Sequence, residues 1–147
     1  MSIDSKLQLH TIEFVDVELK KNPDIDYEEW NQIDGNSIEY KIVPETALHS
    51  DDIHSGRLTV LVELFDVEYL EKKSPFFIKV QAQAFFEDTD KENEKNIFES
   101  FSVNMLSITY PYIRSFISAF TALSGMQAVT IPPINVLSLI SQNEEMQ

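Results

Sequence analysis

The 147-residue chain has no cysteine, which excludes disulfides, zinc–thiolate sites, iron–sulfur clusters and thiol nucleophiles. It has only three glycines, and they do not form a glycine-rich loop of the kind that binds phosphate. Basic residues are also few. Eleven lysines and arginines stand against 25 aspartates and glutamates, which gives a formal net charge of -14. A surface of this sign repels phosphate backbones and anionic lipid headgroups, so we expect neither nucleic acid nor membrane as a partner.

Long apolar runs are missing as well. No stretch approaches the ~20 apolar residues of a transmembrane helix, and the N-terminal segment lacks the basic region and apolar run of a signal peptide. We therefore expect a cytoplasmic protein without membrane insertion. Hydrophobic residues nevertheless make up 43% of the chain, and ten residues are phenylalanine. This content is sufficient for the core of one folded domain spanning residues 1–147.

Alternation of apolar and polar residues predicts four strands. The first covers residues 6–20, and its parity changes near Thr11, which indicates a β-bulge. The second is expected to end at Pro44, and Ser55-Gly56 is expected to form the next turn. The second, third and fourth strands are predicted at 38–42, within 57–70 and at 76–86.

After residue 97 the apolar spacing changes to three and four. The segment 97–105 is expected to be a short helix or irregular. A helix is predicted over 112–124, with Pro111 in its first turn and Gly125 just beyond its end. A final short helix is predicted at 134–141. Strands followed by helices predict an α+β fold, in which helices cover one side of a four-stranded antiparallel sheet.

The helix at 112–124 carries only one charge, Arg114, and small neutral residues lie opposite its apolar stripe. A four-stranded sheet covers only one side of such a helix. We therefore expect the other side to contact a second copy of the chain, and the alternative is that the C-terminal segment folds back over it. The residues expected at this oligomer interface are Tyr112, Ser115, Phe116, Ser118, Ala119 and Ala122.

The polar residues form no pattern typical of catalysis. The spacing of Asp51, Asp52 and His54 is too general to indicate a metal site, and a solvated loop explains these residues better. His10 and His49 lie in a predicted strand and a polar loop. No nucleophile motif such as G-x-S-x-G is present. We expect no enzyme activity, no cofactor and no bound metal.

The C-terminal third carries an ordered set of motifs: Tyr110-Pro111-Tyr112-Ile113-Arg114, then Gly125, then the sequence VTIPPIN at 129–135. This region resembles the SecB chaperone family, and weaker agreement extends the resemblance to about residues 5–141, leaving 142–147 as a tail. The resemblance implies a SecB-like fold: a four-stranded antiparallel sheet, a long interface helix and a short C-terminal helix. It also implies assembly as a dimer of dimers, a homotetramer.

The same resemblance implies an ATP-independent chaperone that binds unfolded or partly folded polypeptides in aromatic-lined grooves, in protein export or elsewhere. Carried over by position, the groove residues are Trp30, Tyr27 and Phe76. The family also presents carboxylates on its sheet surface to the export motor SecA. Asp16 matches one of them and Glu18 is nearby, whereas two others fall at Lys20 and Lys79, which reverses their charge.

Two classes of function follow from these residues. One is a general chaperone for unfolded chains. The other is a dedicated adaptor or chaperone for one partner, such as an antitoxin, that works independently of SecA, and the reversed charges at Lys20 and Lys79 favour it. A carrier of small ligands is a third possibility, but the pocket has no polar residues that would give specificity. Core packing explains Trp30 as well as a groove does.

Overall fold

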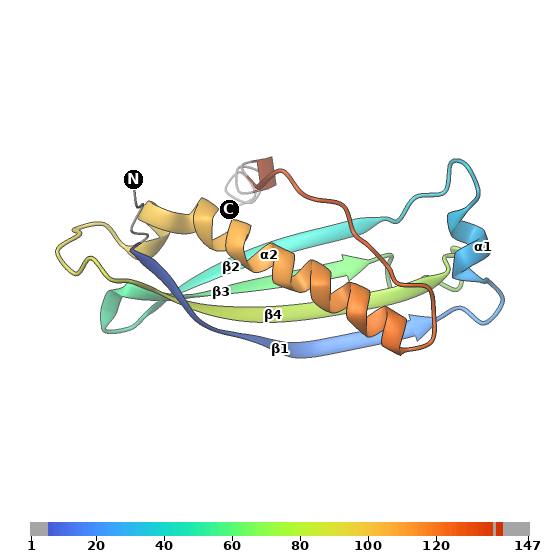
Figure 1. Ribbon diagram of the computed structural model, residues 1–147, viewed down its shortest axis with the longest axis horizontal. Helices are drawn as coiled ribbons and strands as arrows, with labels where there is room; N and C mark the ends of the chain where they lie inside the picture. Colours follow the sequence, from blue (N-terminus) through green and yellow to red (C-terminus); the bar gives the residue numbers. More distant parts are fainter. Residues whose placement is uncertain (1–5, 137, 140–147) are drawn as a thin grey trace.

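The computed structural model describes residues 6–136, 138 and 139. A four-stranded antiparallel sheet with the strand order β1-β4-β3-β2 carries one long helix across one of its faces (Figure 1). The elements are β1 (Leu7–Lys21), α1 (Tyr27–Asn31), β2 (Tyr40–His49), β3 (Asp52–Leu64), β4 (Phe76–Asp88) and α2 (Ile97–Leu123). The predicted α+β fold is confirmed.

The core lies between the sheet and α2. Alternate residues of the two central strands, such as Val60 and Val80, point to this face and are fully buried. They meet the apolar stripe of α2, in which Leu106, Ile113 and Ile117 are also buried. The opposite face of the sheet, here called the outer face, carries mostly polar and charged residues.

The strand β1 contains the predicted irregularity. Its register against β4 shifts between Leu9 and Thr11, and again between Phe14 and Asp16. Each extra residue returns the apolar side chains to the helix-facing side, because a strand with a fixed period of two would otherwise turn them to the outer face. The parity change near Thr11 was therefore a correct signal.

The predicted end of the second strand at Pro44 is wrong. β2 continues to His49 and turns directly into β3, so Ser55 and Gly56 lie inside a strand and not in a turn. Proline is tolerated because β2 is an edge strand. The Phe65 N–H donates to the Glu39 carbonyl (2.8 Å), so the odd-numbered residues of β2 direct their backbone groups toward β3. Pro44 has the opposite parity, and its backbone nitrogen therefore points away from β3, where no ladder hydrogen bond is lost.

The predicted helix start after Pro111 is also wrong, because α2 is one helix of 27 residues that begins at Ile97. Its true start carries a capping box: the Asn96 side chain accepts hydrogen bonds from Phe98 N and Glu99 N (2.9 and 3.0 Å). Pro111 lies on the exposed side, where water can bond the carbonyl that loses its helical donor. The helix ends at Leu123, one residue before the predicted end, and Gly125 lies just beyond it as predicted, with a φ of 93°.

After Gly125 the chain turns back and runs along α2 toward β2 (Figure 1). We call residues 126–134 the C-terminal strap. The predicted helix at 134–141 lies only partly within the described residues. There the Asn135 side chain accepts from Ser138 N and its carbonyl accepts from Leu139 N (both 3.0 Å), as at the first turn of a helix. Residues 137 and 140–147 lie outside the described part.

Candidate functional site

The three predicted groove aromatics lie in one cluster at the end of the sheet next to α1. The Asp26 side chain caps this short helix by accepting from Glu28 N (2.9 Å). The Tyr27 ring meets Phe76 edge-on, with ring centroids 5.1 Å apart, and lies 6.1 Å from Trp30. Phe65 completes the cluster at 5.7 Å from Trp30 and 5.2 Å from Phe76.

Burial separates the roles of these rings. Phe76 is 0% exposed and Tyr27 is 7% exposed, and burial raises the pKa of the Tyr27 hydroxyl. Trp30 is only partly buried, and Ile33, three residues further on, is 58% exposed. Trp30 is therefore the ring of the cluster that solvent reaches, whereas Phe76 and Tyr27 support it from below.

Sequence reasoning did not single out Phe65. Its φ of 59° is unusual for a bulky residue, and this backbone conformation turns its ring between Trp30 and Phe76. The strand before it already contains the apolar run Val60-Leu61-Val62, so the consecutive apolar residues Leu64 and Phe65 gave no distinct signal. Both are buried.

A groove of about 510 Å³ lies beside edge strand β2. Its walls are β2 on one side and the end of the strap with the residues after it on the other. The lining residues are Tyr40, Lys41, Ile42, Val43, Pro44, Pro133, Ile134, Asn135, Ser138 and Leu139. The groove begins next to the aromatic cluster, since Glu39 bonds Phe65 and Tyr40 follows directly. Strand alternation alone did not predict it, because its two walls are far apart in the sequence.

The C-terminal strap is held to α2 through its backbone. The Ser118 hydroxyl donates to the Val129 carbonyl (2.9 Å), and the Thr121 hydroxyl accepts from the Val129 N–H (2.8 Å). Further along, Arg114 Nε donates to the Ile131 carbonyl (3.0 Å) and the Tyr110 hydroxyl donates to the Pro132 carbonyl (2.7 Å).

Two apolar side chains of the strap, Val129 and Ile131, are completely buried. The alternative that the C-terminal segment folds back over the helix therefore holds for the side of α2 that carries Arg114, Ser118 and Thr121.

The predicted interface residues divide into two groups. Ser118 bonds the strap within the same chain, and the Phe116 ring stacks on Phe14 with centroids 4.0 Å apart. The others lie on the exposed side of α2. These are Tyr112, Ser115, Ala119 and Ala122.

The predicted partner surface lies on the outer face of the sheet. Lys79 Nζ is 3.0 Å from Asp16 Oδ2, and in the register Lys79 pairs with Glu18 on one side and Glu63 on the other. The hydrogen bond to Asp16 raises the pKa of Lys79, and the charges of Asp16, Glu18 and Glu63 add to the effect. Lys20 is exposed beside Phe77. Lys79 thus partly neutralises the carboxylates around it.

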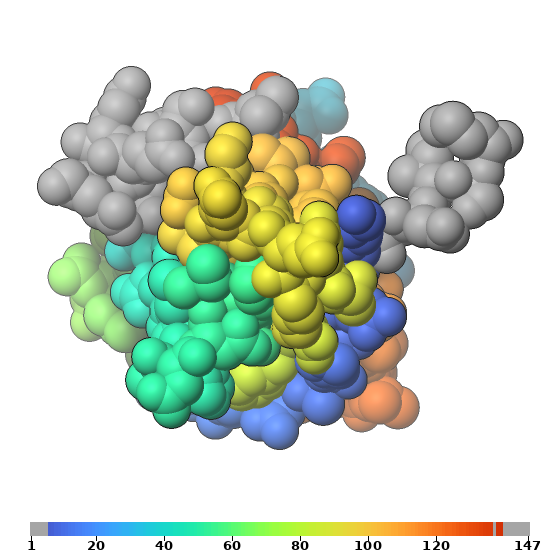
Figure 2. Space-filling model, turned by 90° about the vertical axis from the view of Figure 1, so that its left-hand side faces the viewer, coloured from blue at the N-terminus to red at the C-terminus, as the bar shows by residue number. Residues whose placement is uncertain are grey.

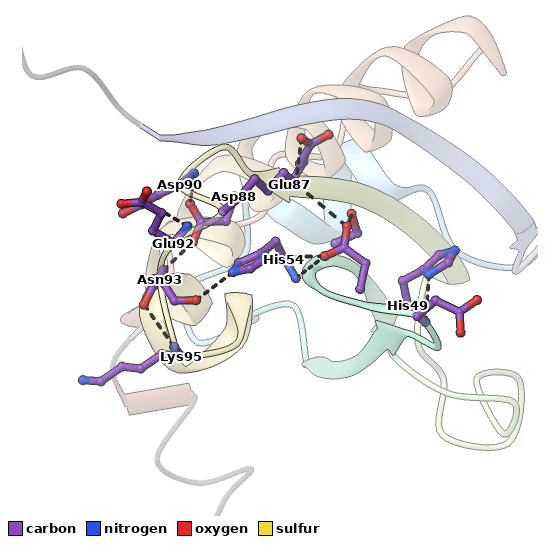
Figure 3. A network of polar contacts seen from close by, with 12 residues as sticks. His49, His54, Glu87, Asp88, Asp90, Glu92, Asn93 and Lys95 are labelled. Atoms are coloured by element: carbon purple, nitrogen blue, oxygen red, sulfur yellow. Dashed lines mark hydrogen bonds and ion pairs between the residues drawn. The ribbon is translucent and has the colours of Figure 1, made fainter.

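A polar network closes the other end of the sheet (Figure 3). His54 Nε2 bonds the Asn93 carbonyl (2.8 Å), while its Nδ1 lies 3.4 Å from Asp52. The buried Asp88 carboxylate accepts from the Asn93 side chain and from Asp90 N (3.2 and 2.9 Å), which fixes the loop before α2. Within the described ranges, three or more metal-ligating side chains nowhere come together. No helix of these ranges is long and apolar enough to cross a membrane.

Comparison with known proteins gives one curated relative, an uncharacterized protein of Methanocaldococcus jannaschii. It is 33% identical over 75 residues, which are 51% of this chain and 48% of the relative, so the match spans about half of each protein. No family model matches the chain. A solved protein of unknown function from Streptococcus agalactiae covers 86% of the chain at 12% identity, with a TM-score of 0.45.

A SecB-like chaperone of Mycobacterium tuberculosis, solved in complex with a ChAD peptide from the HigA1 antitoxin, is structurally more similar. It superposes with a TM-score of 0.60 and 12% identity, covering 88% of each chain. Both proteins share the four-stranded antiparallel sheet and the long helix that crosses it. The chain therefore has the SecB-like fold.

Proposed function

We propose that the protein is a chaperone of the cytoplasm that binds unfolded or partly folded polypeptide without ATP. The binding site is the groove beside β2 together with the aromatic cluster around Trp30. A bound segment, here called the client, lies extended along Tyr40–Pro44 and places apolar side chains between β2 and Ile134.

Support comes first from the continuity of apolar surface. Trp30 is partly exposed, Tyr40 is 47% exposed, and Ile42 and Ile134 line the groove that follows. Aromatic side chains give a large apolar contact with little demand on the sequence of the partner. An edge strand also offers backbone groups to an extended chain. The net charge of -14 keeps such a surface soluble and attracts basic unfolded segments.

Further support comes from the solved protein with the same fold, which carries a bound peptide from an antitoxin. That peptide binds the neighbour, and the present chain has a groove of about 510 Å³ in which an extended segment would fit. From this neighbour we therefore take only the class of ligand, a polypeptide, as a proposal for the present chain.

Titration with a reduced, unfolded protein tests the proposal, because Trp30 is the only tryptophan and its emission reports on the cluster. We expect the emission to change and the aggregation of the unfolded protein to be suppressed. Tyr40→Ser should weaken binding by about tenfold, the effect of truncating an aromatic anchor. The matched control is Ile53→Ser, because Ile53 is similarly exposed (43%) but lies at the far end of β3. Equal binding by both variants and the unmodified protein would contradict the proposed groove.

A second candidate is a dedicated adaptor or chaperone for one partner, such as an antitoxin, that does not use the export motor SecA. The position of Lys79 among Asp16, Glu18 and Glu63 favours it, because the outer face loses the negative charge that a basic partner would need. Under this proposal the basic zinc-containing tail of SecA binds weakly. Lys20→Glu with Lys79→Glu should strengthen that contact, and the gain should decrease as salt is added. Tight binding of the tail by the unmodified protein would instead favour export.

We also propose a homotetramer in which the exposed side of α2 contacts other copies. Tyr112 is 50% exposed and Leu123 is 88% exposed, so the exposed side of α2 carries a large apolar side chain at each end of this stretch. Between them lie the small side chains of Ser115, Ala119 and Ala122, which permit close approach of a second helix.

A further inference from the structure

A second pocket lies at the end of the sheet opposite α1, on the outer face. It has a volume of about 290 Å³. It forms where three strands place Ala47, Arg57 and Phe85 in one cross-strand row, since Ala47 pairs with Arg57 and Arg57 pairs with Phe85. Figure 2 looks onto this end, where the β2–β3 hairpin (green), the loop after β4 (yellow) and the start of β1 (blue) lie next to one another.

Arg57 is the free cation of this pocket. Its side chain is exposed, and its guanidinium makes no hydrogen bond or ion pair with any residue that the structure describes. The other arginine, Arg114, instead donates to the Ile131 carbonyl. In a protein with a net charge of -14, a guanidinium left without a carboxylate partner is available to an anion from outside.

Two carboxylates near the pocket, those of Glu87 and Asp52, are already engaged. Glu87 is bonded by His10 Nε2 (2.9 Å) and by Lys91 Nζ (3.0 Å), and these contacts, that of His10 first, lower the pKa of Glu87. Asp52 accepts from the Ser55 hydroxyl (2.9 Å) and lies 3.8 Å from Lys91. These two carboxylates therefore have local partners and compete less for Arg57.

His49 supplies a second donor. Its Nδ1 accepts a hydrogen bond from Asp51 N (3.2 Å), so a neutral His49 ring carries its proton on Nε2. Figure 3 shows His49 apart from the network of His54, so its ring is not part of those polar contacts. His49 lines the pocket together with Arg57.

The remaining wall contains His10 and Ser55, which are bonded to Glu87 and Asp52, and is otherwise apolar. Phe85 is half-buried, Leu48 is 42% exposed, and Ala47 lies next to Arg57 across the strand pair. The half-buried ring of Phe85 offers a surface on which a second ring can stack or meet edge-on. The pocket thus combines one planar cation, one ring donor and one apolar wall in a small volume.

We infer that this pocket binds a carboxylate that carries one small apolar or aromatic group. A planar guanidinium matches a carboxylate through two parallel hydrogen bonds. The volume lies near the lower limit of about 300 Å³ for small-molecule pockets, which fits a single ring and not a long chain. The overall negative charge opposes anions of higher charge, such as polyphosphates. The carboxylate can belong to a free acid or to the C-terminus of a polypeptide.

Titration of the full chain with 3-phenylpropionate, followed by amide chemical shifts, tests this inference. We expect shifts at Arg57, Phe85 and His49, and no binding of the neutral 3-phenylpropionamide. Arg57→Gln should weaken binding by about tenfold or more, the usual effect of losing a charged hydrogen-bond partner, whereas Arg57→Lys should retain part of it. Lys95→Gln is the matched control, because it removes one exposed positive charge from the loop after β4 at the same end of the molecule, outside the lining of either pocket.

A short peptide ending in phenylalanine, with a free or an amidated C-terminus, distinguishes the two sources of the carboxylate. Binding of the free acid and of the free peptide, both lost in Arg57→Gln, indicates a site that recognises the shared chemistry. Binding of the free peptide alone indicates a site for chain ends. Absence of binding by both acids, or equal binding of acid and amide, or an equal loss in Lys95→Gln, would overturn the inference.

Discussion

Replacing Thr121 by valine should detach the C-terminal strap at its most buried point. The Thr121 side chain is fully buried, and its hydroxyl accepts the Val129 N–H at 2.8 Å while it donates to the Ile117 carbonyl at 2.8 Å. Valine has nearly the same shape but cannot accept, so the Val129 N–H is left buried without a partner. An unsatisfied buried donor costs about 1–3 kcal/mol. We therefore expect the free energy of unfolding to fall by about 2 kcal/mol, or roughly 4–8 °C in Tm for a chain of this size.

Thr109 provides the matched control. It is equally buried in the same helix, and its hydroxyl also donates to a carbonyl one turn earlier, that of Met105 (2.8 Å). No backbone N–H of the described residues donates to it, so Thr109→Val should change the stability by less than about 0.5 kcal/mol.

Urea unfolding followed by Trp30 emission measures both variants. It should be done at one fixed protomer concentration, because any assembly would make the apparent stability depend on concentration. Hydrogen exchange at the Val129 amide gives an independent measurement, and its protection should fall in Thr121→Val only. Equal losses in both variants, or an unchanged Val129 amide, would show that the strap does not depend on this hydrogen bond.

Three further predictions follow from contacts described above. Burial raises the pKa of Tyr110 from 10.0 to about 12, so the buried neutral hydroxyl stabilises the fold fully below pH 10, and this stabilisation is lost as the pH rises from 10 to about 12. Tyr110→Phe should flatten the dependence of stability on pH in that window, and phenolate absorbance measures the titration. A Cβ at Gly56 would lie 2.7 Å from the Phe98 ring, so Gly56→Ala should destabilise the fold by about 1–3 kcal/mol in chemical denaturation, and Phe98→Leu should relieve part of the loss. Ala119→Glu places a charge on the exposed side of α2 and should reduce the mass seen by light scattering from that of a tetramer, whereas Gln127→Glu, outside the helix, should not; a monomeric unmodified protein would contradict the proposed assembly.

The strands of this fold could be predicted because apolar and polar residues alternate along them. The parity change near Thr11 was visible in the sequence and corresponds to a real register shift. The end of β2 was not visible, because residues 45–49 (ETALH) show no clear alternation and are paired with β3 all the same. Whether Pro44 breaks its strand depends on whether that strand lies at the edge of the sheet, and the local sequence does not indicate this.

The start of α2 was missed although the sequence carried the signal. Asn96 and Glu99 have the spacing of a capping box, but the presence of Pro111 favoured a later start. The groove beside β2 depends on the path of the strap, which is set by hydrogen bonds from α2 to backbone groups. Phe65 depends on a left-handed backbone that residue type alone does not indicate. Contacts of this kind involve distant segments, so local periodicity does not reveal them.

The manner in which the strap is fastened affects how its sequence can diverge. Its hydrogen bonds with α2 all use backbone groups of the strap, those of Met126, Val129, Ile131 and Pro132, and almost any residue type supplies the same groups. Val129 and Ile131 are fully buried, Met126 and Ile134 at the two ends of the strap pack partly against the core, and Thr130 is exposed. The strap therefore tolerates substitution at its outward positions as long as these apolar side chains, above all Val129 and Ile131, are kept. The fold can therefore persist while most residues of the strap are substituted. The residues of α2 that bond the strap are those in which substitutions should be rarest.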